Sequence, residues 1–223
     1  MTEKVFDLRI PYSRVYADFD LEGEKMVILR PRFAAFKAIA DGGFSREATV
    51  AAAVHYLVKP GNDYVITGKD DETFSARAVE MSDLLDKDGF SVIAIADAAL
   101  EACGVTDDDD APPEIEGDGY SSPIIYKLRW PLTVGDVTVT HIEFRARSYK
   151  VMRHVWQADS AGESIERFLR HAGRTIHDGG DEDIPMTGEI MGLIDGYDLA
   201  SISAHVLPVF TQGGGKLRRR QTS

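Results

Sequence analysis

With 223 residues, 43% of them hydrophobic and 28% charged, the chain is a folded protein long enough for two domains of about a hundred residues each. Its net charge of -12 argues against nucleic acid as the main partner. No apolar run approaches the roughly 20 residues that span a bilayer, and the N-terminus lacks the apolar core of a signal peptide. The single cysteine, Cys103, excludes an internal disulfide and a cysteine-rich metal site. We therefore expect a cytoplasmic protein with no membrane partner.

The N-terminal part of the chain predicts strands followed by a helix. Residues 5–10 predict a first strand, and residues 15–19 and 26–29 predict a hairpin that turns around Gly23. Pro31 cannot donate to a strand ladder, so a helix is expected to begin near Phe33. Its apolar face consists of Phe33, Phe36 and Ile39.

A second helix is expected after Ser45, a plausible N-cap, with an apolar face formed by Val50, Val54, Leu57 and Val58. Residues 64–67 predict a short strand that has no counterpart later in the chain. Helices around residues 81–85 and over 89–102 complete the first domain.

Residues 124–211 predict the same kinds of element again. Strands are expected over residues 124–130 and 137–145, with a turn near Gly135. A helix follows with Tyr149, Met152, Val155 and Trp156 on one face, and the next helix, residues 164–171, carries Ile165 and Phe168. Residues 178–183 predict a loop, and residues 186–194 and 199–210 predict the last two helices.

Three local sequence matches indicate an internal duplication of one small domain. Leu8-Arg9-Ile10-Pro11 matches Leu128-Arg129-Trp130-Pro131 at an offset of 120, and the Arg30/Arg32 pair matches Arg145/Arg147 at an offset of 115. Leu84-Leu85-Asp86, followed by Phe90 and Ile93, matches Leu193-Ile194-Asp195, followed by Leu199 and Ile202, at an offset of 109. Because loop lengths vary between duplicated domains, a falling offset is expected. The predicted fold class is α+β, with two tandem copies of a small antiparallel sheet that has helices on one face.

The predicted boundaries follow composition. Residues 1–103 form the first repeat and residues 124–211 the second. Residues 104–123 contain four consecutive aspartates and no basic residue, which predicts an acidic flexible linker. Residues 212–223 carry Lys216, Arg218, Arg219 and Arg220 and predict a basic flexible tail. Asp86 and Asp195 precede the last helix of each repeat, where an aspartate can cap backbone N–H groups.

The sequence lacks the motifs of common catalytic sites. The six histidines have no cysteine or carboxylate at a metal-ligand spacing. There is no Gly-x-Ser-x-Gly, no Gly-x-x-x-x-Gly-Lys and no Gly-x-Gly-x-x-Gly after a strand. The two repeats share no pair of titratable residues that could act as general acid and general base. We expect no cofactor, no metal and no enzymatic activity.

The paired arginines Arg30, Arg32, Arg145 and Arg147 are the sharpest polar feature. Residues two apart on a strand project from one face, which would give a basic stripe beside a helix start. The alternative is a solvated edge whose guanidinium stems cover apolar surface. Together with nearby apolar side chains, the candidate partner-binding residues are Arg30, Arg32, Phe33, Phe36, Arg145, Arg147, Tyr149, Met152 and Trp156.

The pattern of matched residues resembles the tail assembly chaperones of long-tailed bacteriophages and prophages. The features are a strand ending in proline, a glycine hairpin, an arginine at a strand end and an aspartate before a final amphipathic helix. Residues 124–211 carry the better match, through Leu128, Pro131, Gly135, Phe144-Arg145, Asp195, Leu199 and Ile202. Two such units and an acidic linker depart from the usual single unit.

The resemblance implies a non-enzymatic factor of the host cytoplasm that binds the tape measure protein, keeps it soluble and helps to recruit tail tube subunits. A structural tail or baseplate component that stays in the particle is the first alternative, and an uncharacterised enzyme is the second. The partner's identity and the oligomeric state stay open. A further alternative to the binding hypothesis is that all the apolar stripes are buried in the cores of the two domains.

Overall fold

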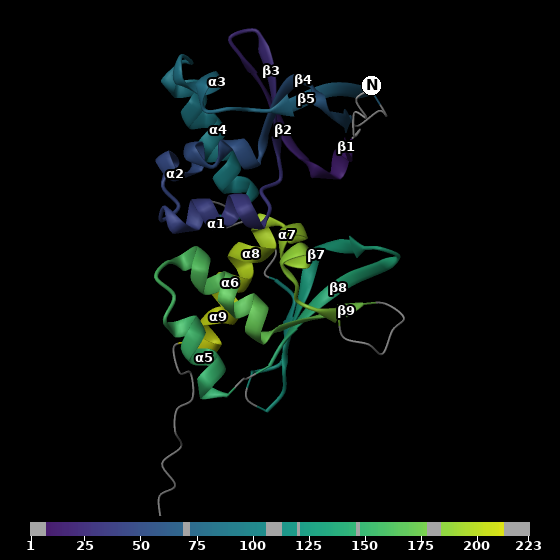
Figure 1. The fold of residues 1–223 in the computed structure, drawn as a ribbon, viewed down its shortest axis with the longest axis vertical. Helices are drawn as coiled ribbons and strands as arrows, with labels where there is room; N and C mark the ends of the chain where they lie inside the picture. The colour runs from purple at the N-terminus through teal and green to yellow at the C-terminus, as the bar shows by residue number, and fades with distance from the viewer. Residues whose placement is uncertain are drawn as a thin grey trace, which may run out of the picture. The chain divides into compact units, whose positions relative to one another are not determined.

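The computed structural model describes residues 8–68, 72–105, 113–119, 121–145, 148–177 and 184–211. The chain divides into two compact units. The first consists of Met1–Asp108 together with Asp195–Tyr197, and the second of Asp109–Ile194 and Asp198–Ser223. Each unit has its own sheet and its own helices (Figure 1).

The first unit contains a sheet in which one long strand is central. Its strands are β1 (Leu8–Ile10), β2 (Val15–Leu21), β3 (Glu24–Leu29), β4 (Leu57–Thr67) and β5 (Thr73–Ala78). The strand β4 pairs with β3 and β5 in the antiparallel sense and with β1 in the parallel sense. The β2–β3 turn places Glu22 and Gly23 at positive φ, as the predicted glycine hairpin requires.

The helices of the first unit are α1 (Phe33–Asp41), α2 (Arg46–Ala51), α3 (Ser82–Leu85) and α4 (Gly89–Ala102). Ser45 caps α2 as predicted, because its side chain accepts a hydrogen bond from the N–H of Ala48. The predicted continuation of this helix to Leu57 and Val58 is wrong. Both residues are buried in β4, where they pair with Ile28 and Val27 of β3. Long-range strand pairing overrides the helical spacing of these side chains.

The second unit contains a five-stranded sheet in the order β10-β9-β8-β7-β6 in which all neighbours are antiparallel. Its strands are β6 (Ile115–Glu116), β7 (Ile124–Val134), β8 (Val137–Phe144), β9 (Gly173–His177) and β10 (Ile184–Pro185). Its helices are α5 (Tyr149–Trp156), α6 (Ala161–Ala172) and α7 (Gly188–Leu193). The last helix runs from α8 (Gly196–Ser201) through a π-helical turn, Ile202–Val206, into α9 (Leu207–Thr211). The π turn ends two residues before Pro208, which has no N–H to donate.

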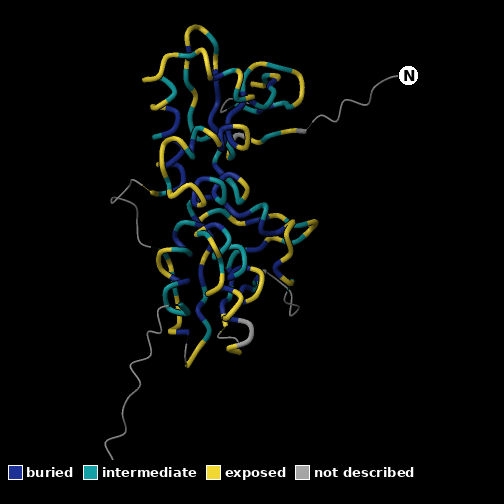
Figure 2. Tube along the Cα trace, turned by 60° about the vertical axis from the view of Figure 1, so that its left-hand side comes forward, coloured by how far each residue is buried: buried dark blue, intermediate teal, exposed yellow. Residues whose placement is uncertain are grey.

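After the first strand of each unit, β1 or β6, the two units share one succession of elements: two strands, two helices, two strands and two helices. In each sheet the four corresponding strands are neighbours in sequence order, β2-β3-β4-β5 and β7-β8-β9-β10, and all are antiparallel. In each unit the helices gather on one side of the sheet (Figure 1). Buried stretches lie in the middle of each unit, whereas turns and helix ends are exposed (Figure 2). The α+β fold class is therefore confirmed.

Two of the predicted correspondences are wrong in detail. Leu8–Ile10 forms β1, which pairs with β4, whereas the matched residues 128–130 lie in the hairpin strand β7. The counterpart of β7 is β2. The β4–β5 hairpin, for which no counterpart was expected, corresponds to β9–β10.

The last helices of the two units also correspond in a register that differs from the predicted one. Asp88 accepts a hydrogen bond from the N–H of Ser91 and caps α4, so the predicted cap Asp86 is wrong. Asp88-Gly89-Phe90 and Asp195-Gly196-Tyr197 each begin a final helix, at an offset of 107. At this offset the buried residues Ile95 and Ala99 correspond to the buried residues Ile202 and Val206. The predicted offset of 109 instead pairs exposed Phe90 and Ile93 with buried Leu199 and Ile202.

Parts of the predicted linker and tail lie outside the described residues. These are residues 106–112, which include the four aspartates, Tyr120, and residues 212–223. Within the predicted linker, Ile115–Glu116 forms β6 and pairs with Tyr126 and Ile125 of β7. This short segment therefore belongs to the second sheet.

Candidate binding surfaces

Arg30 and Arg32 flank Pro31 in the connection between β3 and α1. Neither lies on a strand, so the predicted strand-borne stripe is wrong. The Nε of Arg30 donates to the carbonyl oxygen of Ser13 at 3.2 Å, and its guanidinium lies 5.6 Å from the centroid of the Tyr16 ring. Arg14 Nη2 in turn donates to the carbonyl oxygen of Arg30 at 3.0 Å. These contacts hold the connection against β2. They favour a structural role for Arg30 over a partner-binding role.

The residues Asp195–Tyr197, which belong to the first unit, complete this arginine cluster. Asp195 is 7% exposed and forms an isolated antiparallel bridge with Arg32. The N–H of Gly196 donates to the carbonyl oxygen of Pro31 at 2.6 Å. As predicted, Asp195 caps the helix that follows: its Oδ1 accepts from the N–H of Tyr197 at 3.0 Å. The cluster consists of Arg14, Arg30, Arg32 and Asp195.

Burial dominates the electrostatics of the arginine cluster. It raises the pKa of Asp195 to about 6, although the hydrogen bond from Tyr197 and the charges of Arg30, Arg14 and Arg32 all oppose the rise. Burial also lowers the pKa of Arg14 to about 10, and the neighbouring Arg32 lowers it further. The negative charge of Asp195 and the positive charges of the arginines thus partly neutralise each other inside the unit.

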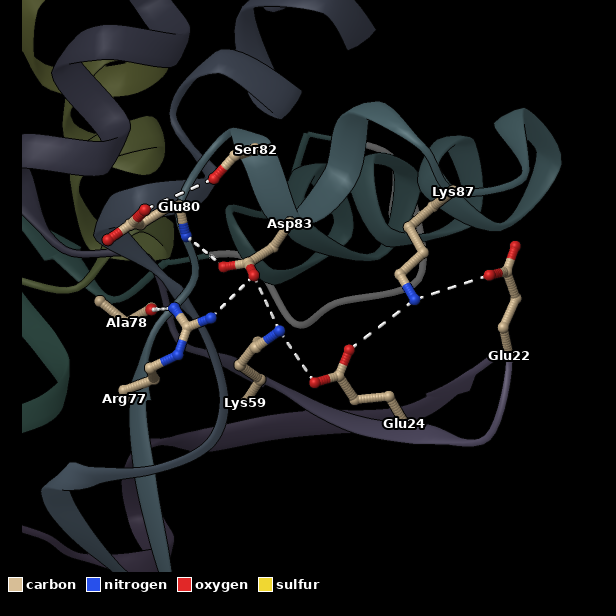
Figure 3. Close-up of polar contacts among 9 residues, drawn as sticks. All are labelled: Glu22, Glu24, Lys59, Arg77, Ala78, Glu80, Ser82, Asp83 and Lys87. Atoms are coloured by element: carbon tan, nitrogen blue, oxygen red, sulfur yellow. Dashed lines mark hydrogen bonds and ion pairs between the residues drawn. The ribbon is translucent and has the colours of Figure 1, made fainter.

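A second polar cluster joins β3, β4, β5 and α3 of the first unit (Figure 3). Asp83 Oδ1 accepts from Arg77 Nη2 at 2.7 Å and from Lys59 Nζ at 2.8 Å. These hydrogen bonds, led by that of Arg77, hold the pKa of Asp83 well below its ordinary value. The remaining ion pairs join Lys59 to Glu24 and Lys87 to Glu22 and Glu24. Because each carboxylate in these pairs faces a cation, the cluster stabilises the unit.

The clearest exposed aromatic surface of the second unit is on α5. Tyr149 is 71% exposed and Trp156 is 47% exposed, and their ring centroids lie 5.7 Å apart. The other predicted member of this stripe, Met152, is buried with Val155 in the core. The helix therefore uses one face for packing and presents two large aromatic side chains on another.

The remaining predicted binding residues have mixed surroundings. Phe36 is buried and packs edge-on against Phe44 with 5.7 Å between the ring centroids, and Phe33 is half-buried. Arg145, the residue after β8, is exposed and pairs with Glu143. Arg147 lies outside the described residues. In the first unit most of the predicted apolar face of α1 is therefore buried in the core.

Two apolar side chains that are not among the predicted binding residues are also exposed on the first unit. Leu85 and Phe90, at the end of α3 and the start of α4, are 74% and 84% exposed. The predicted offset of 109 matched Phe90 to Leu199, which is buried. The recurrence of Asp-Gly-Phe as Asp-Gly-Tyr could have revealed the true register.

One buried polar contact of the second unit was also missed. Asp198 is fully buried, and its Oδ1 accepts from Tyr126 Oη at 2.9 Å and from the N–H of Arg129 at 3.0 Å. It joins α8 to β7 and acts in packing. No group of three or more His, Cys, Asp or Glu side chains among the described residues is placed to hold a metal ion.

Comparison with protein-family models, with curated proteins and with solved structures gives no match to this chain. Within the described parts of the chain, no helix has the length and apolar character needed to cross a membrane.

Proposed function

We propose that this chain is a phage tail assembly chaperone, a non-catalytic protein of the host cytoplasm. It binds the tape measure protein, keeps its long helical segments soluble and helps to recruit tail tube subunits. The observation that carries the proposal is the exposed pair Tyr149 and Trp156 on α5. This pair lies in the unit whose sequence most resembles the chaperone family.

The chemistry of the α5 surface suits a helical apolar client. Tyrosine and tryptophan bury a large area at a small cost in side-chain entropy, and both are enriched among the residues that dominate binding energy. An amphipathic client helix can lay its apolar face against such a pair. Arg145 lies four residues before Tyr149 and is exposed, so it can select acidic client positions and increase the association rate.

The first unit contributes less to client binding in this proposal. Its corresponding helix α1 buries Phe36 and Ile39, and Arg30 is held by Ser13 and Tyr16. The client-binding role that was predicted for both repeats is therefore assigned to the second.

Co-expression with the tape measure protein tests the proposal. The wild-type chain should increase the soluble yield of the client, and the double variant Tyr149→Ser/Trp156→Ser should lose most of that increase. Leu85→Ser is the control, since it removes an apolar side chain of the first unit that is at least as exposed as Tyr149 and Trp156. An unchanged client yield with the folded wild-type protein would contradict the proposal.

A second measurement separates the chaperone from a tail component. A chaperone is released before the particle matures, so mass spectrometry of purified particles should not find this chain. A stoichiometric amount of it in the particles would instead favour the structural component.

A further inference from the structure

The pairing of β2 with β3 brings arginines of the first unit together. Arg14 ends the 3-10 turn η1 (Tyr12–Arg14) directly before β2, and Arg30 directly follows β3. Because the two strands are antiparallel, these residues are neighbours, and the N–H of Arg30 donates to the carbonyl oxygen of Arg14 at 2.7 Å. Arg32 lies two residues further along, at the N-cap of α1. The hairpin and the helix start therefore place three guanidinium groups in one cluster.

The cluster carries more positive than negative charge. Asp195 interacts electrostatically with all three arginines and is almost fully buried. One carboxylate against three guanidinium groups leaves an excess of two positive charges. Burial and the charges of Arg32 and Arg30 together lower the pKa of Arg14 to about 10, although Asp195 opposes this. A lowered arginine pKa is expected where too little negative charge lies nearby.

Two guanidinium groups of the cluster also have donors that the fold does not use. The Nη2 of Arg14 donates to the carbonyl oxygen of Arg30, which fixes the side chain, but its Nε is buried without a hydrogen-bond partner. Among the described residues, no side-chain hydrogen bond or ion pair involves Arg32. A buried N–H without an acceptor costs about 1–3 kcal/mol, and more when the group is charged. A ligand that supplies acceptors and negative charge would remove this cost.

The start of α1 adds to the positive potential of the cluster. The helix begins at Phe33, immediately after Arg32, and spans Phe33–Asp41. Its N-cap makes no side-chain hydrogen bond, and its first turn contains no acidic residue. The positive end of the helix dipole is therefore not offset locally, and such an end favours anions.

We propose that the three arginines bind a phosphate group beside Asp195, either as free phosphate or as the phosphate ester of a small organic molecule. A phosphate group carries a charge of about −1.5 to −2 at pH 7, which offsets the excess of positive charge. Its oxygens can accept from guanidinium groups that approach from different directions. Arg14 and Arg32 supply the donors, and Arg30, whose side chain has other contacts, contributes its charge.

Asp195 makes binding to this site dependent on pH. When it is ionised it repels the anion, and its pKa is about 6, so it loses most of its charge as the pH falls to about 5. The other groups that face it are Arg14, Arg30, Arg32 and Cys103. Arginines stay charged over this range, and burial raises the pKa of Cys103, so that its thiol stays neutral. Binding should consequently tighten in weak acid.

Isothermal titration calorimetry of the full chain with sodium sulfate tests the proposal at a constant ionic strength set with sodium chloride. Sulfate is the probe because it stays a dianion, whereas phosphate gains a proton near about pH 6. The wild-type chain should bind a single sulfate. Arg32→Gln should weaken binding at least about tenfold, because it removes a charged donor that the fold does not use. Arg46→Gln is the matched control, since Arg46 lies in the same unit but pairs with Asp97, and it should bind like the wild type.

Asp195→Asn gives a readout that a purely structural cluster would not show. Asparagine keeps the side-chain oxygen that accepts from the N–H of Tyr197 but removes the charge. This variant should bind sulfate about tenfold more tightly at pH 7 and should lose the pH dependence of binding. Circular dichroism confirms that each variant is folded. Sulfate affinity that is the same in Asp195→Asn as in the wild type at pH 7 would overturn the proposal.

A comparison of inorganic phosphate with phenyl phosphate distinguishes the two sources of the phosphate group. Tighter binding of phenyl phosphate supports a phosphate ester, and tighter binding of inorganic phosphate supports the free anion. A folded wild-type chain that binds none of the three anions would overturn the proposal. Equal weakening by Arg32→Gln and Arg46→Gln would do so as well, because it would show a diffuse attraction to positive charge. These results leave the client-binding proposal, which concerns α5 of the second unit, to its own test.

Discussion

Two short segments of this chain, Asp88-Gly89-Phe90 and Asp195-Gly196-Tyr197, share their chemistry and differ in their surroundings. Each begins the final helix of a repeat, and each uses its aspartate to cap that helix. The first is exposed, whereas the second lies in the first unit against Pro31, Cys103 and Gly104. Local sequence therefore sets where the helix begins, and tertiary packing decides which copy is buried.

The same tripeptide is buried in one copy and exposed in the other, so the two copies should contribute differently to stability. Around Asp195 the contacts contribute to the stability of the first unit, because they bury a carboxylate, a glycine and an aromatic ring together. Around Asp88 the same groups contact water. Substitutions at the second segment should consequently lower the free energy of unfolding, whereas matched substitutions at the first should change it little.

The largest expected effect is that of a larger side chain at Gly196. Gly196→Val should lower the free energy of unfolding by about 3 kcal/mol, because its Cβ has no room beside Cys103 and Pro31. Gly89→Val should change it by less than about 0.5 kcal/mol, since that position is open. Urea titration at low protein concentration measures both. Equal losses in the two variants would show that the segments do not differ in packing.

Much of the fold follows from short-range patterns in the sequence. The glycine turn at Gly23, the cap at Ser45 and the strand-to-helix transitions after Leu29 and Phe144 were all predicted. The end of α2 was not, because Leu57 and Val58 fit a helical stripe equally well. Only their pairing partners, about thirty residues earlier in the chain, decide the outcome.

The candidate surfaces were predicted less completely, for a related reason. Residues that share a helical face are visible in the sequence, but the face that packs is not. Tyr149, Met152 and Trp156 were selected as one stripe, and only Met152 is buried. Arg30 was interpreted as a strand residue, either in a partner-binding stripe or on a solvated edge, whereas it lies in a loop where its side chain contacts the Ser13 carbonyl and the Tyr16 ring. Phe90 was matched to a core residue because a three-residue match suggested the wrong register.

The next expected effect is the pH dependence of stability at Asp195. Its pKa of about 6 in the folded state lies above the ordinary value of 3.8. The folded state therefore binds this proton more tightly, and the contribution to stability is lost as the pH rises from about 4 to about 6. Asp195→Asn should remove about 2 kcal/mol of this pH dependence. Asp88→Asn should leave it unchanged, and urea titrations at several pH values give the comparison.

Asp83, in the same unit, should show a pH dependence of stability opposite to that of Asp195. Its pKa is held below the ordinary value by Arg77 and Lys59, so its contribution is present above pH 4 and is lost as the pH falls below that value. Asp83→Asn should cost about 1.5 kcal/mol at pH 7, because it replaces charge-assisted hydrogen bonds. The loss should shrink in acid. A loss that is instead constant between pH 7 and pH 3 would exclude ionisation of Asp83 as its cause.

The smallest expected effect tests the register of the two final helices. Asp88→Ala should cost about 1 kcal/mol, because it removes the side chain that accepts from the N–H of Ser91 at the start of α4. Asp86→Ala is the matched control. It lies two residues earlier, at the cap position that the offset of 109 predicts, and it should change stability by less than about 0.5 kcal/mol. A larger loss for Asp86→Ala than for Asp88→Ala would restore the offset of 109, and the equivalence of the two Asp-Gly-aromatic segments would fail with it.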